Sequence, residues 1–125
     1  MGRIKRASLI PLLVALLLIN PGVVLAGSQT GTVRFEYGTV FSNGNNPGWT
    51  FFYLDKGTSR VGSPGCATYN NGQRWVIYNG WPAAKIQIAI LLSASIAGKK
   101  VYVQGNDNCD VWGDSETVMD VHLIE

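Results

Sequence analysis

The stretch PAAKIQIAILLSASIAGKKVYVQ, residues 82–104, decides the fold. Pro82 suits the first helical position, because its missing N–H would have no partner there. Gly98 suits the position just after a helix, where a positive φ is needed. We therefore predict a helix over residues 82–97, followed by a strand over residues 100–104 with Val101 and Val103 facing inward.

The predicted helix is unusually apolar along its whole length. One stripe is formed by Ile86, Ile90, Ser93 and Ala97, with Leu91 and Ala94 beside it. The only clearly polar residues are Lys85, Gln87 and Ser95. A helix of this kind is expected to be buried on more than one side. We expect it to pack against a sheet and to face another subunit.

Short strands are predicted on both sides of this segment. Val33, Phe35 and Tyr37 alternate with Thr32, Arg34 and Glu36, which is the period of a half-buried strand. The predicted strands are residues 32–41, 49–54, 66–69, 74–78 and 116–124, besides 100–104. Asn70-Asn71-Gly72 predicts a tight turn that joins residues 66–69 and 74–78 in a hairpin.

The last strand is predicted to alternate regularly. One face would carry Thr117, Met119, Val121 and Leu123, and the other Val118, Asp120, His122 and Ile124.

These elements predict a mainly β fold with one α-helix and about five to six short strands. A flat sheet of this size would leave exposed edges. A small, partly closed antiparallel barrel of the oligonucleotide/oligosaccharide-binding (OB) kind avoids them. The alternative is a plain antiparallel sheet with one helix across it.

The first 26 residues have the pattern of a secretory signal peptide. Arg3, Lys5 and Arg6 precede an apolar run over residues 9–19, and Val24-Leu25-Ala26 predicts cleavage after Ala26. The run is short of the ~20 residues that span a bilayer. We expect residues 1–26 to be removed and residues 27–125 to form one exported domain, periplasmic or extracellular.

Removing 26 of the 125 residues leaves 99, which is one small domain. Cleavage also removes three of the ten basic residues, which leaves seven basic and eight acidic residues. Within residues 27–125, the only adjacent basic pair is Lys99-Lys100. Nucleic acid is therefore not an expected partner, because its binding needs clustered basic residues.

The two cysteines, Cys66 and Cys109, are expected to form a disulfide in an oxidising compartment. A zinc site is the alternative, but only His122 could join them, which is a poor ligand set.

No catalytic residue, metal ligand or cofactor is predicted. His122 lies beside Asp120, yet no nucleophile motif accompanies them. Residues 106–114 hold several oxygen ligands without the EF-hand spacing for calcium, and a polar loop fixed by the disulfide is the alternative. Glycoside hydrolysis needs two carboxylates at a defined separation in space, and the sequence does not test that separation.

The surplus of aromatic residues suggests a binding face. Four Trp, five Tyr and four Phe all lie within residues 27–125, more than so small a core absorbs. The candidate ligand-binding residues are Trp49, Tyr69, Trp81, Trp112, Asp110 and Asp114. Aromatic faces beside hydrogen-bonding groups suit sugar rings or a protein interface. The alternative is that these rings close the ends of a barrel.

A resemblance to known proteins rests on the order of several short motifs along the chain. These motifs are Gly31-x-Val33, Cys66-Ala67, the helix end Leu91-Leu92-x-Ala94-x-x-x-Gly98-Lys99, Val101-x-Val103 and Cys109. This layout resembles small secreted bacterial proteins similar to the pentameric B subunits of A–B toxins of the subtilase and pertussis type. The resemblance implies an OB barrel, a ring oligomer with its helices at the centre, and glycan binding. It assigns no glycan-binding serine to this chain.

The sequence thus predicts a secreted, non-enzymatic binding module for a glycan or protein receptor, and the resemblance implies a pentamer-like homo-oligomer. The alternative is a periplasmic or secreted protein-interaction or inhibitor domain. A small hydrolase is a third hypothesis, motivated only by the acidic residues and His122.

Overall fold

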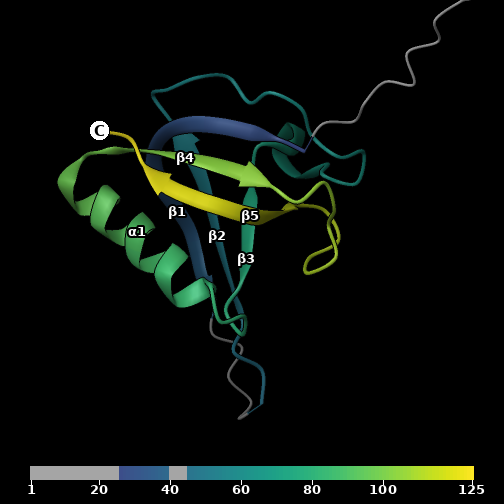
Figure 1. The fold of residues 1–125 in the computed structure, drawn as a ribbon. Coiled ribbons are helices and arrows are strands. Elements are labelled where there is room, and N and C mark those ends of the chain that lie inside the picture. The colour runs from purple at the N-terminus through teal and green to yellow at the C-terminus, as the bar shows by residue number, and fades with distance from the viewer. Residues whose placement is uncertain (1–25, 40–44) are drawn as a thin grey trace, which may run out of the picture.

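The computed structural model describes residues 26–39 and 45–125. The elements are β1 (Ser28–Thr39), β2 (Trp49–Asp55), the 3₁₀ helix η1 (Tyr69–Gly72), β3 (Trp75–Tyr78), α1 (Ala84–Ala97), β4 (Lys100–Gly105) and β5 (Glu116–Leu123). Figure 1 shows the helix beside the strands, where it contacts β1, β4 and β5. The predicted mainly β fold with one helix is confirmed.

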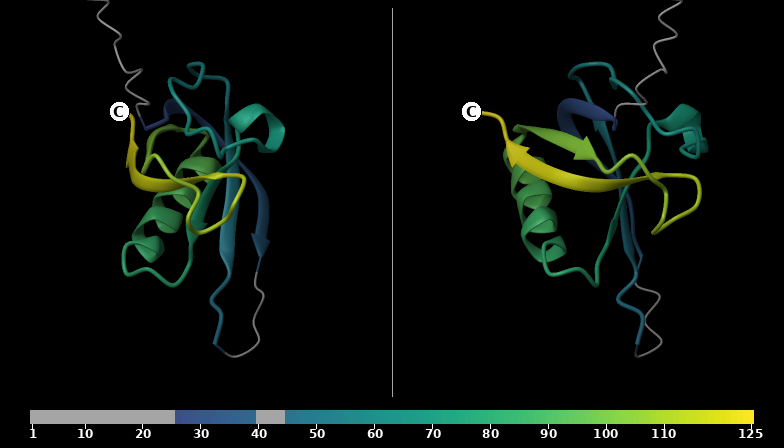
Figure 2. Two further views of the ribbon diagram at one scale, coloured as in Figure 1. Left: turned by 90° about the vertical axis from the view of Figure 1, so that its right-hand side faces the viewer. Right: turned by 45° about the vertical axis from the view of Figure 1, so that its right-hand side comes forward.

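The five strands form a closed ring in the order β1-β2-β3-β5-β4. The long β1 closes it, since one part pairs with β2 and the other with β4. Every pairing is antiparallel except that of β3 with β5, where Trp75 lies opposite Glu116. Figure 2 shows how β4 and β5 cross over the upright β1, β2 and β3. A ring of this kind leaves no long unpaired strand edge.

The predicted strand at residues 66–69 is wrong. The chain there leads into η1, and Asn70 and Asn71 both have positive φ, 48° and 57°. Asparagine tolerates this left-handed region, and here both residues lie within η1 instead of at the two-residue turn of a hairpin. The backbone N–H groups of Thr68 and Tyr69 instead donate to the carbonyl oxygen of Asp114. The predicted hairpin with residues 74–78 is therefore absent, and β3 pairs with β2 and β5.

The regular alternation predicted for the last strand is also wrong. Gly105 lies opposite Val118 and Gln104 opposite Asp120, so Met119 is an extra residue in a bulge. Val118 and Val121 are consequently both buried. A similar irregularity falls at Glu36 in β1, between Phe35 and Tyr37. Phe41, the predicted end of the first strand, lies outside the described residues.

The core fills the inside of the ring and the space under α1. Trp75 and Phe52 are its largest fully buried side chains, and Phe35 packs against it. The helix buries a single stripe consisting of Ala84, Gln87, Leu91 and Ala94.

The predicted helical stripe through Ile86 is not the buried one. Ile86 is 68% exposed and Ile96 is 88% exposed. The prediction was wrong because a helix that is apolar all round does not indicate which of its faces meets the sheet. The C-terminal end is as predicted, with Gly98 at φ 64°. No helix among the described residues is long and apolar enough to cross a membrane.

Candidate functional site

The outer face of β2 and β3 is rich in aromatic side chains. Strand side chains alternate, so Phe52 and Leu54 enter the core while Trp49 and Phe51 belong to the opposite face. In the same way Trp75 and Ile77 enter the core from β3, and Tyr78 faces out beside Trp49.

These rings form one continuous set, which we call the aromatic row. It consists of Phe51, Trp112, Trp49, Tyr78 and Trp81. Trp112 meets both Phe51 and Trp49 edge-on, with ring centroids 5.1 Å apart in each case. Tyr78 continues the row, 6.1 Å from Trp49 and 6.0 Å from Trp81. Edge-to-face packing at these distances is the favoured geometry for aromatic pairs.

The aromatic row changes from buried to open along its length. Phe51 is 4% exposed, whereas Trp81, at the turn before α1, is 39% exposed. Trp49, Tyr78 and Trp112 are half-buried. The open end also carries polar groups, since the side chain of Asn79 bonds both Thr50 Oγ1 (2.7 Å) and the Pro47 carbonyl (3.1 Å). The row therefore offers accessible ring area next to amide groups.

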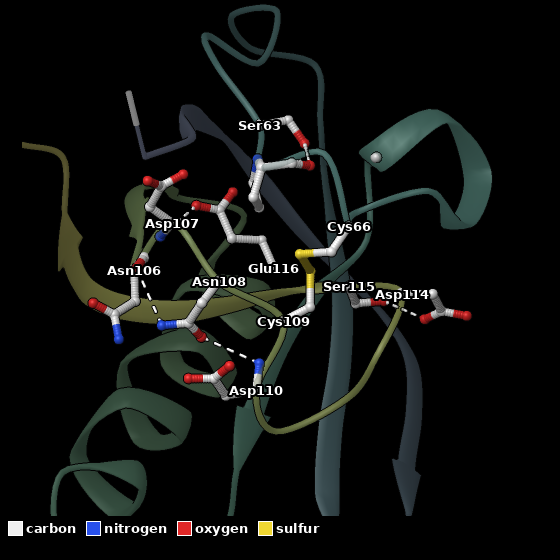
Figure 3. Close-up of a disulfide and its surroundings, with 12 residues drawn as sticks. Ser63, Cys66, Asn106, Asp107, Asn108, Cys109, Asp110, Asp114, Ser115 and Glu116 are labelled. Atoms are coloured by element: carbon white, nitrogen blue, oxygen red, sulfur yellow. Dashed lines mark hydrogen bonds between the residues drawn. A yellow bond between two sulfur atoms is a disulfide. The ribbon is translucent and has the colours of Figure 1, made fainter. Parts of the chain in front are cut away.

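The loop that carries Trp112 is fixed at several points. The predicted disulfide between Cys66 and Cys109 is confirmed, with its Cα atoms 6.1 Å apart (Figure 3). The Asp114 carbonyl accepts the N–H groups of Thr68 and Tyr69, both at 3.1 Å. Trp112 lies between these attachments, so the loop presents its indole in a defined position.

Arg74 connects the base of this loop to the strands. Its guanidinium is stacked between two rings, 3.6 Å from the centroid of Tyr69 and 4.5 Å from that of Phe51. It donates to Ser115 Oγ and Asp114 Oδ1, both at 2.8 Å. The side chain is only 7% exposed, so these contacts are largely shielded from solvent and are strong.

Glu36, the residue at the irregularity of β1, completes this cluster. Its carboxylate accepts from Arg74 Nη1 at 3.4 Å, from Tyr53 Oη at 3.0 Å and from Tyr69 Oη at 3.3 Å. Burial, with a contribution from the bond to Glu36, raises the pKa of Tyr53 above its usual value. Tyr53 thus remains a hydrogen-bond donor through the neutral pH range.

The six residues predicted as a site fall into three groups. Trp49, Trp81 and Trp112 belong to the aromatic row. Tyr69 and Asp114 belong to the Arg74 cluster, where both side chains hold Arg74 in place. Asp110 is exposed, and its backbone N–H donates to Asn108 Oδ1 in a local turn (Figure 3).

Sequence reasoning missed Phe51, Tyr78 and Arg74 as members of this face. A signal was present, because Phe51 follows Trp49 at the two-residue period of a strand. Likewise Arg74 and Tyr78 are separated by four residues and share one side of their strand. The pairing that brings Trp49 opposite Tyr78 could not be read from the sequence.

The single histidine lies elsewhere, on the outside of β5. His122 Nδ1 is 3.2 Å from Asp120 Oδ2, and its ring stacks on Tyr102 with centroids 4.8 Å apart. Both His122 and Asp120 are about half exposed. Within residues 26–39 and 45–125, no group of three or more His, Cys, Asp or Glu side chains is placed to hold a metal ion.

No protein-family model, curated protein or solved structure matches the chain.

Proposed function

We propose that the chain is an exported, non-enzymatic binding module built on an OB-type barrel. Three features support this assignment: five strands in the order β1-β2-β3-β5-β4, a parallel contact between β3 and β5, and a helix between β3 and β4. OB barrels bind oligosaccharides and oligonucleotides on the face of their second and third strands, next to the loops that flank it. The aromatic row occupies that face.

The ligand we propose is a glycan or a receptor protein, bound across the aromatic row. The observation that carries this proposal is the exposed ring of Trp81 in contact with Tyr78 and, through it, with Trp49 and Trp112. Indole rings provide large rigid contact surfaces at low entropic cost, and the amide of Asn79 supplies hydrogen bonds nearby. The proposed ligand is not a nucleic acid, because the seven basic residues after Ala26 are not clustered on this face.

Assembly into a ring of subunits is the second part of the proposal. It is supported by the resemblance to pentameric toxin B subunits and by the exposed apolar residues of α1, which are Ile86, Leu92 and Ile96. Exposed apolar side chains on a helix are a feature of association sites. A self-associating ring would present several aromatic rows at once, which raises avidity for a surface that carries many glycans.

The test of ligand binding is a glycan array probed with the oxidised protein, followed by calorimetric titration of the strongest hit. Trp81→Ala should weaken binding at least tenfold and leave the fold intact, because Trp81 is partly exposed. Tyr102→Ala, which removes an aromatic ring from β4, is the control and should bind normally. Equal losses in both variants, or no glycan or receptor bound by the wild type, would overturn this proposal.

The alternative function is a periplasmic or secreted protein-interaction or inhibitor domain. The exposed apolar residues of α1 favour it equally, because they could meet a different protein instead of a second copy. Light scattering behind a sizing column distinguishes the proposed ring from this alternative. A mass near five protomers supports the ring, and a monomer that captures one exported partner in a pull-down supports the alternative.

A further inference from the structure

A buried carboxylate lies where the described chain begins. Glu116 is fully buried. Its Oε1 atom accepts the backbone N–H of Gly27 at 2.9 Å and that of Asp107 at 3.1 Å. Its Oε2 atom accepts from Nη2 of Arg60, whose side chain is 2% exposed and stacks on Trp75. Figure 3 shows Glu116 reaching toward Asp107.

Gly27 is held closely against this carboxylate. A Cβ atom at this position would lie 2.4 Å from Glu116 Oε2 and 2.8 Å from Arg60 Nε, so only glycine fits without rearrangement. The Gly27 carbonyl accepts the N–H of Gly105 at 2.7 Å. The next residue, Ser28, exchanges two backbone hydrogen bonds with Val61. The nitrogen of Gly27 is therefore fixed in place by its own backbone.

Gly27 is also the residue that would follow the cut predicted after Ala26. We propose that export cleaves the Ala26–Gly27 bond and that the new α-ammonium group of Gly27 binds the buried Glu116 carboxylate. In this hydrolysis the C–N bond breaks, water supplies OH to the Ala26 carbonyl carbon, and the Gly27 nitrogen gains protons to become –NH₃⁺. The inference rests on the export part of the proposed function and is independent of ligand binding and assembly.

Cleavage would change the character of an existing contact. A neutral amide N–H now donates to Glu116, and an ammonium would make a charge-assisted hydrogen bond, which is shorter and stronger. Glu116 would then pair with two cations, the terminus and Arg60. Ala26 is only half-buried, so the nitrogen would be open to water on the side from which Ala26 departs. Processing would thereby stabilise the folded domain.

The pH dependence has a definite sign. The charged groups facing the terminus are Glu116, which favours its protonated form through the direct hydrogen bond, and Arg60, which lies close to Gly27 and opposes it. The Asp107 side chain is exposed, and the neighbouring Gly105 and Val61 carry no charge. Burial of Gly27 and the charge of Arg60 lower the pKa of this amine, and Glu116 raises it. We expect the direct bond to Glu116 to outweigh both, so that the pKa of the folded terminus lies above the ~7.7–8.0 of an unfolded α-amine. The added stability is fully present below that range and is lost as pH rises through the folded pKa.

The test compares two forms of residues 27–125 that differ only at the terminal nitrogen. Both are made by joining a synthetic 27–65 peptide, with a free or an acetylated terminus, to a 66–125 fragment at Cys66. Acetylation restores the amide that Ala26 provides in the precursor. At pH 6 the free form should melt about 4–8 °C higher, and at pH 10.5 the two should melt together, because every other titrating group is shared.

Equal melting at pH 6, or a more stable acetylated form, would overturn the ammonium contact. Glu116→Gln in both forms should abolish the difference; if that variant does not fold, the pH comparison on the wild-type pair decides alone. Terminal sequencing of the exported protein checks the cut itself and should begin at Gly27. A different terminus would refute the processing step, whereas a correct terminus without the stability difference would refute the contact only.

Discussion

Trp112 meets Phe51 edge-on with ring centroids 5.1 Å apart, although they lie 61 positions apart in the sequence, one in a loop and the other in β2. The contact places the loop between β4 and β5 over the outer face of the sheet. Because Trp112 also meets Trp49, the same indole both attaches the loop and extends the aromatic row. Stability of the loop and the shape of the proposed binding face are therefore linked.

Trp112→Ala should affect both properties. We expect the free energy of unfolding to fall by about 2 kcal/mol, less than the ~3–5 kcal/mol typical of a fully buried tryptophan, because Trp112 is half-buried. Urea unfolding followed by circular dichroism measures this loss. Ligand affinity should fall as well, and a variant that binds like the wild type would exclude Trp112 from the binding face.

Removal of the disulfide tests how firmly the loop is held. The bridge closes a separation of 43 residues, so the Cys66→Ser, Cys109→Ser double variant should lose about 4 kcal/mol in the chain-entropy account. Denaturant titration of the oxidised protein and of the variant gives the difference. A loss below about 1 kcal/mol would contradict this account and would mean that residual structure already restrains the unfolded chain without the bridge.

Arg34 also lies over an aromatic ring, with its guanidinium carbon 4.4 Å from the centroid of Tyr53. Arg74 and Arg34 therefore offer a matched comparison of two stacked arginines. Arg74 is buried between two rings and bonds Ser115, Asp114 and Glu36. Arg34 forms an ion pair with Asp55, and these two side chains are 54% and 41% exposed. Lysine cannot reproduce the planar set of donors. Arg74→Lys should therefore cost about 2 kcal/mol, and Arg34→Lys less than about 1 kcal/mol. Equal costs in thermal unfolding would contradict the role assigned to Arg74.

Gly105 and Gly113 provide a test of the packing around the buried Glu116 carboxylate. A Cβ at Gly105 would lie 2.0 Å from Glu116 Oε1, whereas one at Gly113 would meet nothing within 4 Å. Gly105→Ala should destabilise the domain by about 2–3 kcal/mol through overpacking. Gly113→Ala should be close to neutral. Similar melting temperatures for the two variants would show that Glu116 moves aside at little cost.

The exposed side of α1 makes a prediction about assembly. Ile96 is 88% exposed and Ile86 68%, so replacing both with glutamate should leave the monomer folded while placing charges on the proposed interface. Light scattering should then give one protomer mass in place of the oligomer that we propose for the wild type. Val61→Glu is the control, since Val61 is 62% exposed and lies in the loop after β2, where its backbone pairs with Ser28. An oligomer that survives the helix substitutions would exclude α1 from the interface.

How far the sequence predicts this fold differs from element to element. The helix end at Gly98 and the strand alternation of Val101 and Val103 follow from local rules that depend on a few neighbouring residues, and the structure agrees with both. The irregularities at Glu36 and Met119 could not be predicted, because a bulge depends on the register with a distant strand. The buried face of α1 could not be predicted either, since its sequence is apolar on every side.

In the candidate site, too, some features follow from local sequence and others depend on distant contacts. Trp49, Trp81 and Trp112 are recognisable from their type and their place beside polar loop residues. Their contact with one another depends on the order of the strands and on the position of the disulfide loop, both of which are tertiary. Asp114 and Tyr69 looked like ligand-binding groups, but Arg74 engages both. A buried arginine uses such groups for structure, and its burial cannot be read from the sequence.

The most direct test of the central claim follows the four tryptophan indole N–H signals by NMR while a panel of soluble mono- and disaccharides, led by the best array hit, is added. The account predicts shifts for Trp81, Trp49 and Trp112, which lie in the aromatic row. Trp75 serves as an internal control, because it is fully buried and its Nε1 donates to Gln29 at 3.2 Å. Shifts confined to Trp75, or a bound sugar that leaves the signals of Trp81, Trp49 and Trp112 unchanged, would contradict binding at the aromatic row.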